Sequence, residues 1–286
     1  MISLIQLGTL DYATGLALQQ QLVALRKEEK IGDVLLLLEH KPVITLGRNA
    51  KATNVVASPE FLKDSGVELF ECDRGGDVTF HGPGQIVGYP IFDLRGFANP
   101  DGKRKTLGVI EFVRRLEDVL MRTCADFAIP TKRVAGLTGV WTDVEVISAR
   151  VGADAFVRPV EQSSTEALTT SKYPEAKLAA IGVHISRYVT SHGFALNVNT
   201  DLSYFNLIIP CGITSKPVTS MQKELGKQLD LNAVAESISR NFGVVFQSQI
   251  LWVDTLDALL GRIVGVPMKP PANLRQLQNE DDTTWA

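Results

Sequence analysis

The chain has 286 residues, 45% of them hydrophobic and 21% charged, a composition that is ordinary for a globular protein. Its net charge of −3 at pH 7 provides no overall basic field, so nucleic acid is not an expected partner. No uncharged apolar run approaches the ~18 residues that a membrane span needs, so a membrane is not expected to be a partner either.

The cysteines and the N-terminus indicate a compartment. The three cysteines, at positions 72, 124 and 211, are an odd and low count that does not fit a disulfide framework. The first residues lack the basic segment and the long apolar segment of a secretion signal. A reducing cytoplasm, where free thiols persist, is therefore the expected location.

The N-terminal part of the chain predicts strands around one long helix. Residues 2–7 are strand-like, and 11–30 carry an apolar helical face that begins at Asp11, a favourable N-cap. The continuous apolar run 34–38 predicts a central strand buried on both faces, and 43–46 predicts another strand.

The middle of the chain predicts a short helix, three strands and a long helix. Ser58 and Pro59 fit the N-cap and the first position of the short helix. The strands are expected at 67–72, 77–81 and 85–93. Spacings of three and four predict a long helix over 106–127, whose buried stripe comprises Ile110, Val113, Leu116, Leu120, Cys124 and Phe127.

The rest of the chain predicts strands around 132–150 and 177–198 and helices at 232–242 and 255–263. Because strands and helices are interspersed without a regular rhythm, we expect an α/β (α+β) fold, a mixed sheet with flanking helices. One domain is expected over 1–265, with a mobile polar loop at 161–175 and a disordered tail at 266–286.

Four glycines surround a short strand-like segment within Arg74–Gln85. Glycine in strand-forming sequence usually marks a tight turn or a close approach of the backbone to a ligand. The segment is therefore either a ligand-binding loop or a strand between two turns, with Arg74 and His81 on the surface. It is not a dinucleotide fingerprint, because Gly82–Gly84 leads into a strand and not a helix.

Small residues also interrupt the strands of Lys177–Asn197, where Ala180, Gly182 and Ala195 would suit a narrow slot. Lys177 begins an otherwise apolar strand. A lysine there is usually a solvated strand end. The alternative is a partly desolvated lysine that serves as a base.

Cys211 follows an apolar run and lies between a proline and a glycine. A cysteine after such a run is more often a buried core thiol. The flanking residues instead suggest a turn in which the thiol is exposed and backbone N–H groups bind an oxyanion. Cys124 lies on the helical stripe and Cys72 lies in a strand, so both are assigned to packing and Cys211 is the candidate nucleophile. The four histidines have no paired metal-ligand spacing, so neither a metal nor a cofactor is expected.

Taken in this order, Arg74–Gln85, Lys177 with His192–Asn197, and Pro210–Gly212 resemble the octanoyltransferases, or lipoyl(octanoyl) transferases. This family is related to the biotin and lipoate protein ligases, and the resemblance covers roughly residues 5–245. It implies a mixed sheet around an acyl-binding tunnel and a role in lipoate biosynthesis. It implies transfer of octanoate from acyl carrier protein to a lysine of lipoyl domains, in 2-oxo acid dehydrogenases and in the glycine cleavage H protein.

The resemblance also assigns residues. Cys211 is the implied nucleophile, and Lys177 is its proton-transfer partner in both steps of a thioester mechanism. The implied substrate contacts are Arg74, Gly75, Gly76, Asp77, Val78, Thr79, Phe80 and His81, then Ala180, Ile181 and Gly182, and then Gly193, Phe194 and Ala195. The acidic carrier protein would meet basic side chains, for which the candidates are Arg48, Lys132, Arg133 and Arg187.

The sequence departs from the family pattern at three places. His184 stands where arginine is common, Phe80 stands where tyrosine is common, and the connection from Trp141 to Lys177 is longer than usual. None of these changes removes a catalytic group. We hypothesise that the loop at 161–175 modulates access to the acyl tunnel.

Three other functions stay open from the sequence. The first is an ATP-dependent lipoate ligase, which would not need Cys211. The second is a Cys–His hydrolase, with His184 or His192 as base and Asn197 or Asp201 orienting it. The third is a non-catalytic protein that binds lipoyl domains or fatty acyl groups.

Overall fold

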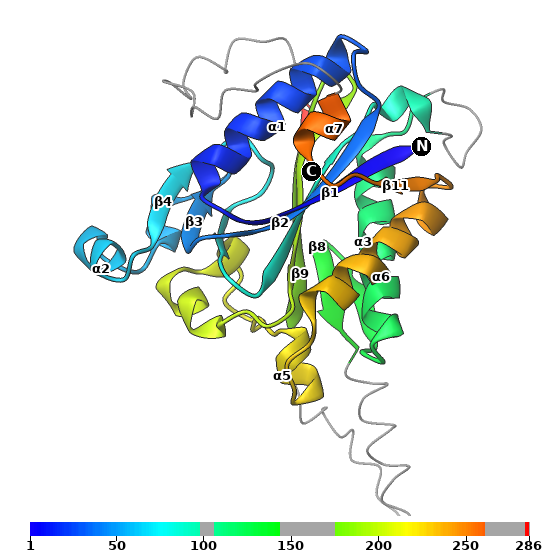
Figure 1. The fold of residues 1–286 in the computed structure, drawn as a ribbon. Helices are drawn as coiled ribbons and strands as arrows, with labels where there is room; N and C mark the ends of the chain where they lie inside the picture. Colours follow the sequence, from blue (N-terminus) through cyan, green and yellow to red (C-terminus); the bar gives the residue numbers. More distant parts are fainter. Residues whose placement is uncertain (98–105, 144–174, 261–283, 286) are drawn as a thin grey trace, which may run out of the picture.

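The computed structural model describes residues 1–97, 106–143, 175–260 and 284–285 (Figure 1). The expectations for 144–150, for 161–174 and for most of the C-terminal tail lie outside these residues. The strands of the large sheet are β1 (Ile2–Leu10), β2 (Asp33–His40), β6 (Gln85–Ile91), β7 (Thr131–Val134), β8 (Leu137–Thr142), β9 (Lys177–Ser186), β10 (Val189–Asn197), β11 (Ile250–Trp252) and β12 (Thr284–Trp285).

The large sheet is mixed. Its order is β11-β1-β2-β6-β10-β9-β8-β7, and β12 pairs with β9 outside this path. β1 runs parallel to both β2 and β11, whereas the other neighbours are antiparallel. The α/β (α+β) fold with a mixed sheet, expected from the irregular order of elements, is therefore confirmed.

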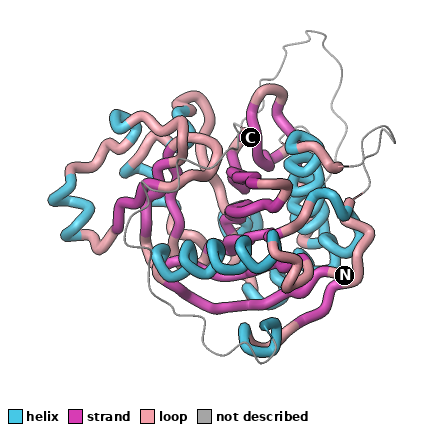
Figure 2. The backbone as a smooth tube through the Cα atoms, turned by 90° about the horizontal axis from the view of Figure 1, so that it is seen from above, coloured by secondary structure: helices cyan, strands magenta, loops and turns pink. Residues whose placement is uncertain are grey.

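Helices cover both faces of the large sheet (Figure 2). α1 (Tyr12–Lys27) and α7 (Leu256–Leu260) pack on one face, and α3 (Val109–Asp126) and α6 (Leu231–Val245) pack on the other (Figure 1). The leucines of β2 pack alternately against the helices on the two faces of the sheet, because neighbouring side chains of a strand point to opposite faces. This is the central strand, buried on both sides, that the run 34–38 predicts.

A small second sheet, in the order β4-β3-β5, stands beside the large one. It consists of β3 (Val43–Leu46), β4 (Glu68–Glu71) and β5 (Val78–His81). The described residues also form short helices: η1 (Ala52–Asn54), α2 (Pro59–Asp64), η2 (Leu94–Gly96), η3 (Leu202–Leu207), η4 (Pro210–Gly212) and α5 (Met221–Leu225). Because η4 packs on β5, the glycine-rich segment and Cys211 are brought together from distant parts of the chain.

Most predicted boundaries agree with the structure, and local hydrogen bonds explain why. Asp11 caps α1 by accepting from Thr14 N (2.8 Å), and Ser58 caps α2 by accepting from Phe61 N (3.2 Å). Such caps satisfy N–H groups that the first turn of a helix leaves without partners.

The structure differs from the expectations at three places. Ile110 is 73% exposed, whereas Val109 beside it packs against the core, so the buried stripe of α3 begins at Val109 and Ile110 lies outside it. Glu175, expected in the mobile loop, is fixed by Lys132 Nζ at 2.8 Å and by an ion pair with Lys216. Residues 284–285, expected in the disordered tail, form β12 because their backbone pairs with β9.

A buried histidine makes the fold sensitive to acid. His40 is fully buried with its Nε2 2.6 Å from Tyr89 Oη, and burial lowers the pKa of His40 to about 4. Between about pH 6.5 and 4 the unfolded chain binds a proton here that the folded chain does not. We therefore expect the free energy of unfolding to fall as pH falls through this range, by up to about 1.4 kcal/mol per pH unit from this group.

Urea unfolding at pH 8, 6 and 5 measures this dependence. The His40→Gln variant, which has no titrating ring, is expected to show a shallower decline. An equal decline in both proteins would assign the acid sensitivity to other groups.

Candidate active site

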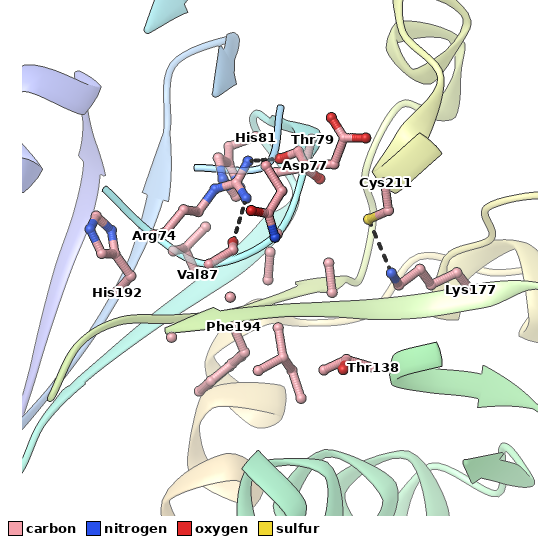
Figure 3. Close-up of a pocket in the computed structure, with 18 of the residues that line it drawn as sticks. Arg74, Asp77, Thr79, His81, Val87, Thr138, Lys177, His192, Phe194 and Cys211 are labelled. Atoms are coloured by element: carbon pink, nitrogen blue, oxygen red, sulfur yellow. Dashed lines mark hydrogen bonds between the residues drawn. The ribbon is translucent and has the colours of Figure 1, made fainter. Parts of the chain in front are cut away.

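A cavity of about 370 Å³ lies between the two sheets (Figure 3). Such a volume is in the range of small-ligand pockets, about 300–1,000 Å³. Its wall contains every site residue expected from the sequence except Val78 and Phe80. The three segments expected to carry the chemistry therefore meet around one cavity, and the glycine-rich segment is not a surface strand with Arg74 and His81 exposed.

Val78 and Phe80 lie in the core of the small sheet instead, packed with Ile44. Strand alternation is the reason, because successive side chains of β5 point to opposite faces. Thr79 and His81 face the cavity and their neighbours face away from it.

Cys211 and Lys177 form a pair at one end of the cavity (Figure 3). Lys177 Nζ donates a hydrogen bond to Cys211 Sγ over 3.2 Å. Cys211 is half-buried and has left-handed backbone angles, φ 56° and ψ 22°, so its turn projects the thiol out of the chain. Cys124, in contrast, is fully buried in the α3 stripe, and burial raises the pKa of its thiol to about 12.

Lys177 is a buried residue and not a solvated strand end, since only 8% of it is exposed. Its backbone is fixed on both sides, because its N–H donates to Pro217 O (2.8 Å) and its carbonyl accepts from Thr219 N (2.9 Å). Its Nζ atom lies 5.3 Å from the centre of the Trp141 ring.

Gly139 makes room for the Lys177 side chain. A Cβ atom at Gly139 would lie 2.9 Å from Lys177 Cε and 2.5 Å from Ala179 O, and the φ of +125° is itself unfavourable for other residues. The N–H of Gly139 is held by the buried carboxylate of Glu117 at 3.1 Å, so the strand has little freedom to retreat.

We expect Gly139→Ala to displace the lysine from the thiol. Misplacement of a reacting group by about 1 Å can cost about a hundredfold in rate, so a fall of tenfold or more in acyl transfer is the expected result. Gly136→Ala is the matched control, because Gly136 also has a positive φ and lies in the same hairpin, but its Cβ would contact nothing within 4 Å. Equal rates for the two variants would contradict the steric role of Gly139.

The expected oxyanion donors in the cysteine turn are already engaged. Gly212 N donates to Ile209 O at 3.1 Å, and Ile213 N donates to Pro210 O at 3.0 Å. These two groups close the turn, so they do not project into the cavity as free donors.

Arg74 shapes the cavity wall. Its guanidinium donates to Thr45 O (2.7 Å), Gly75 O (2.9 Å) and Asp77 O (2.7 Å), and also to the Thr45 hydroxyl. An arginine with this many backbone partners fixes the glycine-rich loop in place.

The end of the cavity away from Cys211 is polar. His192 lies there in Figure 3, and its Nε2 is 2.7 Å from Asp73 Oδ1, while His184 Nδ1 is 2.7 Å from Asp73 Oδ2. Burial alone would raise the pKa of Asp73, yet the hydrogen bonds from the two histidines outweigh burial and hold that pKa well below its ordinary value. Neither histidine is the hydrogen-bond partner of the thiol, so the Cys–His arrangement is not formed.

The orienting residues considered for a hydrolase have other roles. Asn197 donates to Thr219 O (2.9 Å) and accepts from Gln85 (2.8 Å), and Asp201 caps η3 at Ser203.

Sequence reasoning missed part of the cavity wall. The additional lining residues are Tyr12, Asn49, Val87, Tyr89, Gly136, Leu137, Thr138 and Ile213, and His192, which the sequence suggested only as the base of a hydrolase, lines the wall as well. The glycines of the β7–β8 hairpin, at positions 136 and 139, are the one signal that marks this region as a close approach.

The described residues contain no group of three or more His, Cys, Asp or Glu side chains that could hold a metal ion. None of the helices in the described ranges combines the length and the apolar character that crossing a bilayer requires.

Comparisons with known proteins identify the family of the chain. The family model of the lipoyl protein ligase A/B catalytic domain matches residues 11–243. An octanoyltransferase of Koribacter versatilis is 56% identical over 281 residues, which are 98% of each chain. An octanoyltransferase of Acidobacterium capsulatum is 51% identical over 91% of this chain and 96% of that protein.

Solved structures share the fold at low sequence identity. A bipartite lipoate protein ligase of Thermoplasma acidophilum superposes with a TM-score of 0.64 at 14% identity, over 91% of this chain and 90% of that one. A lipoate-protein ligase A bound with ATP gives a TM-score of 0.58 at 14% identity, over 88% and 87% of the two chains. The family match and the near full-length relatives show that this chain is an acyltransferase that belongs to the octanoyltransferases of the lipoyl protein ligase A/B catalytic-domain family.

Proposed function

We propose that this acyltransferase moves an octanoyl group from octanoyl-acyl carrier protein to a lysine of lipoyl domains, in lipoate biosynthesis. The observation that carries the proposal is the contact of 3.2 Å between Lys177 Nζ and Cys211 Sγ beside the cavity. Cys211 is the proposed nucleophile, and the octanoyl chain is proposed to occupy the cavity.

The first step exchanges one thioester for another. Neutral Lys177 takes the proton of the Cys211 thiol, and the thiolate attacks the carbonyl carbon of the carrier thioester. The bond from that carbon to the carrier sulfur then breaks, and the departing thiolate takes the proton back from Lys177. No ATP is needed, because the bond formed and the bond broken are both thioesters.

The second step forms an amide. The incoming lysine amine attacks the Cys211 thioester in its neutral form, and Lys177 accepts the amine proton as the carbon–sulfur bond breaks. The proton then returns to the Cys211 thiolate. One residue thus serves both steps of a ping-pong scheme, in which the thioester of Cys211 is the intermediate.

The cavity wall supports an acyl occupant. Ala180, Gly182 and Ala195, which the sequence suggested would line a narrow slot, line the cavity, and their small size leaves space for a chain. Phe194 belongs to the core and also lines the cavity. Its ring packs directly on the backbone of Gly88, because a Cβ atom at Gly88 would lie 2.1 Å from the ring.

The donor and the acceptors are the carrier protein and the lipoyl domains of 2-oxo acid dehydrogenases and of glycine cleavage H protein. The archaeal ligase with the same fold is described with its E2 lipoyl domain, which supports an acceptor of this class. Of the basic residues considered for docking the acidic carrier, Arg133 is engaged by Glu117 (2.7 Å) and Asp118 (2.5 Å) and has a structural role.

Intact-protein mass spectrometry tests the proposal. Enzyme mixed with octanoyl-carrier protein and no ATP should gain one octanoyl group, and added lipoyl domain should discharge it. If no adduct formed, and ATP with free octanoate instead modified the lipoyl domain, an ATP-dependent ligase would replace the proposal.

A further inference from the structure

The turn that carries Cys211 adopts a conformation that L-amino acids avoid. Cys211 has φ 56° and ψ 22°, and Gly212, which follows it, has φ +65°. A non-glycine residue keeps left-handed angles only where its surroundings fix them. Two hydrogen bonds, from Gly212 N and Ile213 N, lie within the turn, and further contacts reach it from distant parts of the chain.

Asn54 holds the start of this turn from the outside. Its backbone carbonyl accepts a hydrogen bond from Ile209 N at 2.7 Å, two residues before Cys211. Its side chain, which is largely buried, donates through Nδ2 to Asp77 Oδ2 at 2.6 Å. One residue of η1 therefore links the cysteine turn to the glycine-rich loop.

Asp77 forms the floor beneath the turn. Its Oδ1 accepts from Val78 N (2.8 Å) and from Lys51 N (3.2 Å), so the carboxylate is fixed in orientation. A Cβ atom at Gly212 would lie 2.9 Å from Asp77 Oδ2 and 3.4 Å from Asn54 Nδ2. The turn thus rests directly on the Asn54–Asp77 pair, and Asp77 lies at the Cys211 end of the cavity in Figure 3.

We infer that Asn54 and Asp77 are positioning residues for the nucleophile. Their hydrogen bond fixes the surface on which the turn rests, and this keeps Cys211 left-handed with its sulfur within reach of Lys177. Proton transfer between the two groups needs hydrogen-bond distance, so a relaxed turn would slow the reaction without emptying the cavity. The inference rests on the proposed role of Cys211, and it gives Asp77 a role other than the substrate contact expected from the sequence.

Exchanging the two side chains tests the hydrogen bond itself. In Asp77→Asn the new amide keeps an oxygen for Val78 N and Lys51 N, but its nitrogen then faces the nitrogen of Asn54, two donors together. In Asn54→Asp two carboxylates face each other. The double variant Asn54→Asp with Asp77→Asn restores one donor and one acceptor.

The measurement is the single-turnover rate of Cys211 acylation by octanoyl-carrier protein. Each single variant should acylate about tenfold more slowly or worse, as expected for a displaced reacting group. The double variant should recover to within about threefold of the natural protein, which is the coupling that a double-mutant cycle detects. The rate of Cys211 alkylation by iodoacetamide, measured at several pH values, should rank the natural protein, the double variant and the single variants in the same order as the acylation rate. The KM for the donor should change little in Asn54→Asp, because Asn54 does not line the cavity.

Asn241→Ala is the matched control for stability. This asparagine of α6 is also buried, and it donates to Asp126 (3.1 Å) and Ser237 O (3.0 Å) without lining the cavity. It should lower the midpoint of thermal unfolding without slowing acylation.

The outcomes separate this inference from the proposed function. If the natural protein formed no octanoyl adduct, the proposed function itself would fail. If the natural protein acylated normally but the single variants matched its rate, or the double variant were no faster than the slower single variant, the positioning role would be overturned.

Discussion

Cys211→Ser should abolish the acyl-enzyme and lower octanoyl transfer by at least about a thousandfold, the scale seen when a catalytic nucleophile is removed. A serine hydroxyl is a far weaker nucleophile than a thiolate, and the lysine at 3.2 Å does not compensate for this difference. The substitution replaces one atom within an unchanged turn, so binding of the donor and of the lipoyl domain should be kept. Steady-state transfer assays and intact-mass spectra measure the two effects.

Cys72→Ser is the matched control. Cys72 is also a free and partly exposed cysteine, but its thiol donates to Leu46 O at 3.5 Å and it does not line the cavity. This variant should acquire the octanoyl adduct at the rate of the natural protein. A Cys211→Ser protein that still transferred within tenfold of that rate would remove the thioester route.

Much of the fold was predictable because the signals were local. The N-caps of α1 and α2, the apolar run of β2 and the stripe of α3 are each contained in a few neighbouring residues. Ile110 shows the limit of such a signal, because Ile110 and its neighbour Val109 are both apolar, and spacing alone did not show that Val109 is the one that packs against the core.

The candidate site was predictable only as separate segments. Elimination among three cysteines selected Cys211, and a lysine at the start of an apolar strand drew attention to Lys177. Their contact depends on the isolated bridge between Lys177 and Val218 and on the packing of η4 against β5, which no local pattern encodes.

The supporting residues could not be found in the same way. Gly139 and Trp141 contact Lys177 because β8 pairs with β9. The carbonyl of Asn54 accepts a hydrogen bond from Ile209, more than 150 residues later in the sequence. For Asp77 the resemblance implied a substrate contact, but no local pattern indicated the hydrogen bonds that its oxygens accept from Lys51, Asn54 and Val78. Strand alternation is a local rule, and it places Thr79 and His81 on one face of β5 and their neighbours on the other. The sequence did not show which of these two faces lines the cavity.

Lys177→Met should slow the acylation of Cys211 by about 10²–10⁴-fold, the usual contribution of a positioned general base. Methionine is unbranched like the lysine stem and fits the space over Gly139, but it accepts no proton. The thiol would then have to lose its proton to hydroxide or water, without a base held at hydrogen-bond distance. Single-turnover acylation of the variant and of the natural protein measures the loss.

Two further variants sharpen the assignment. Lys177→Arg keeps a positive charge beside the thiol but does not release its proton in proteins. If Lys177 acts as a base, the arginine variant should be nearly as slow as the methionine variant; if only its charge mattered, arginine would restore most of the rate. Lys216→Met is the matched control, because Lys216 faces the same Trp141 ring at 5.9 Å yet has its own carboxylate partner in Glu175. Acylation at the natural rate in Lys177→Met, or an equal loss in Lys216→Met, would show that the lysine at the thiol is not the base.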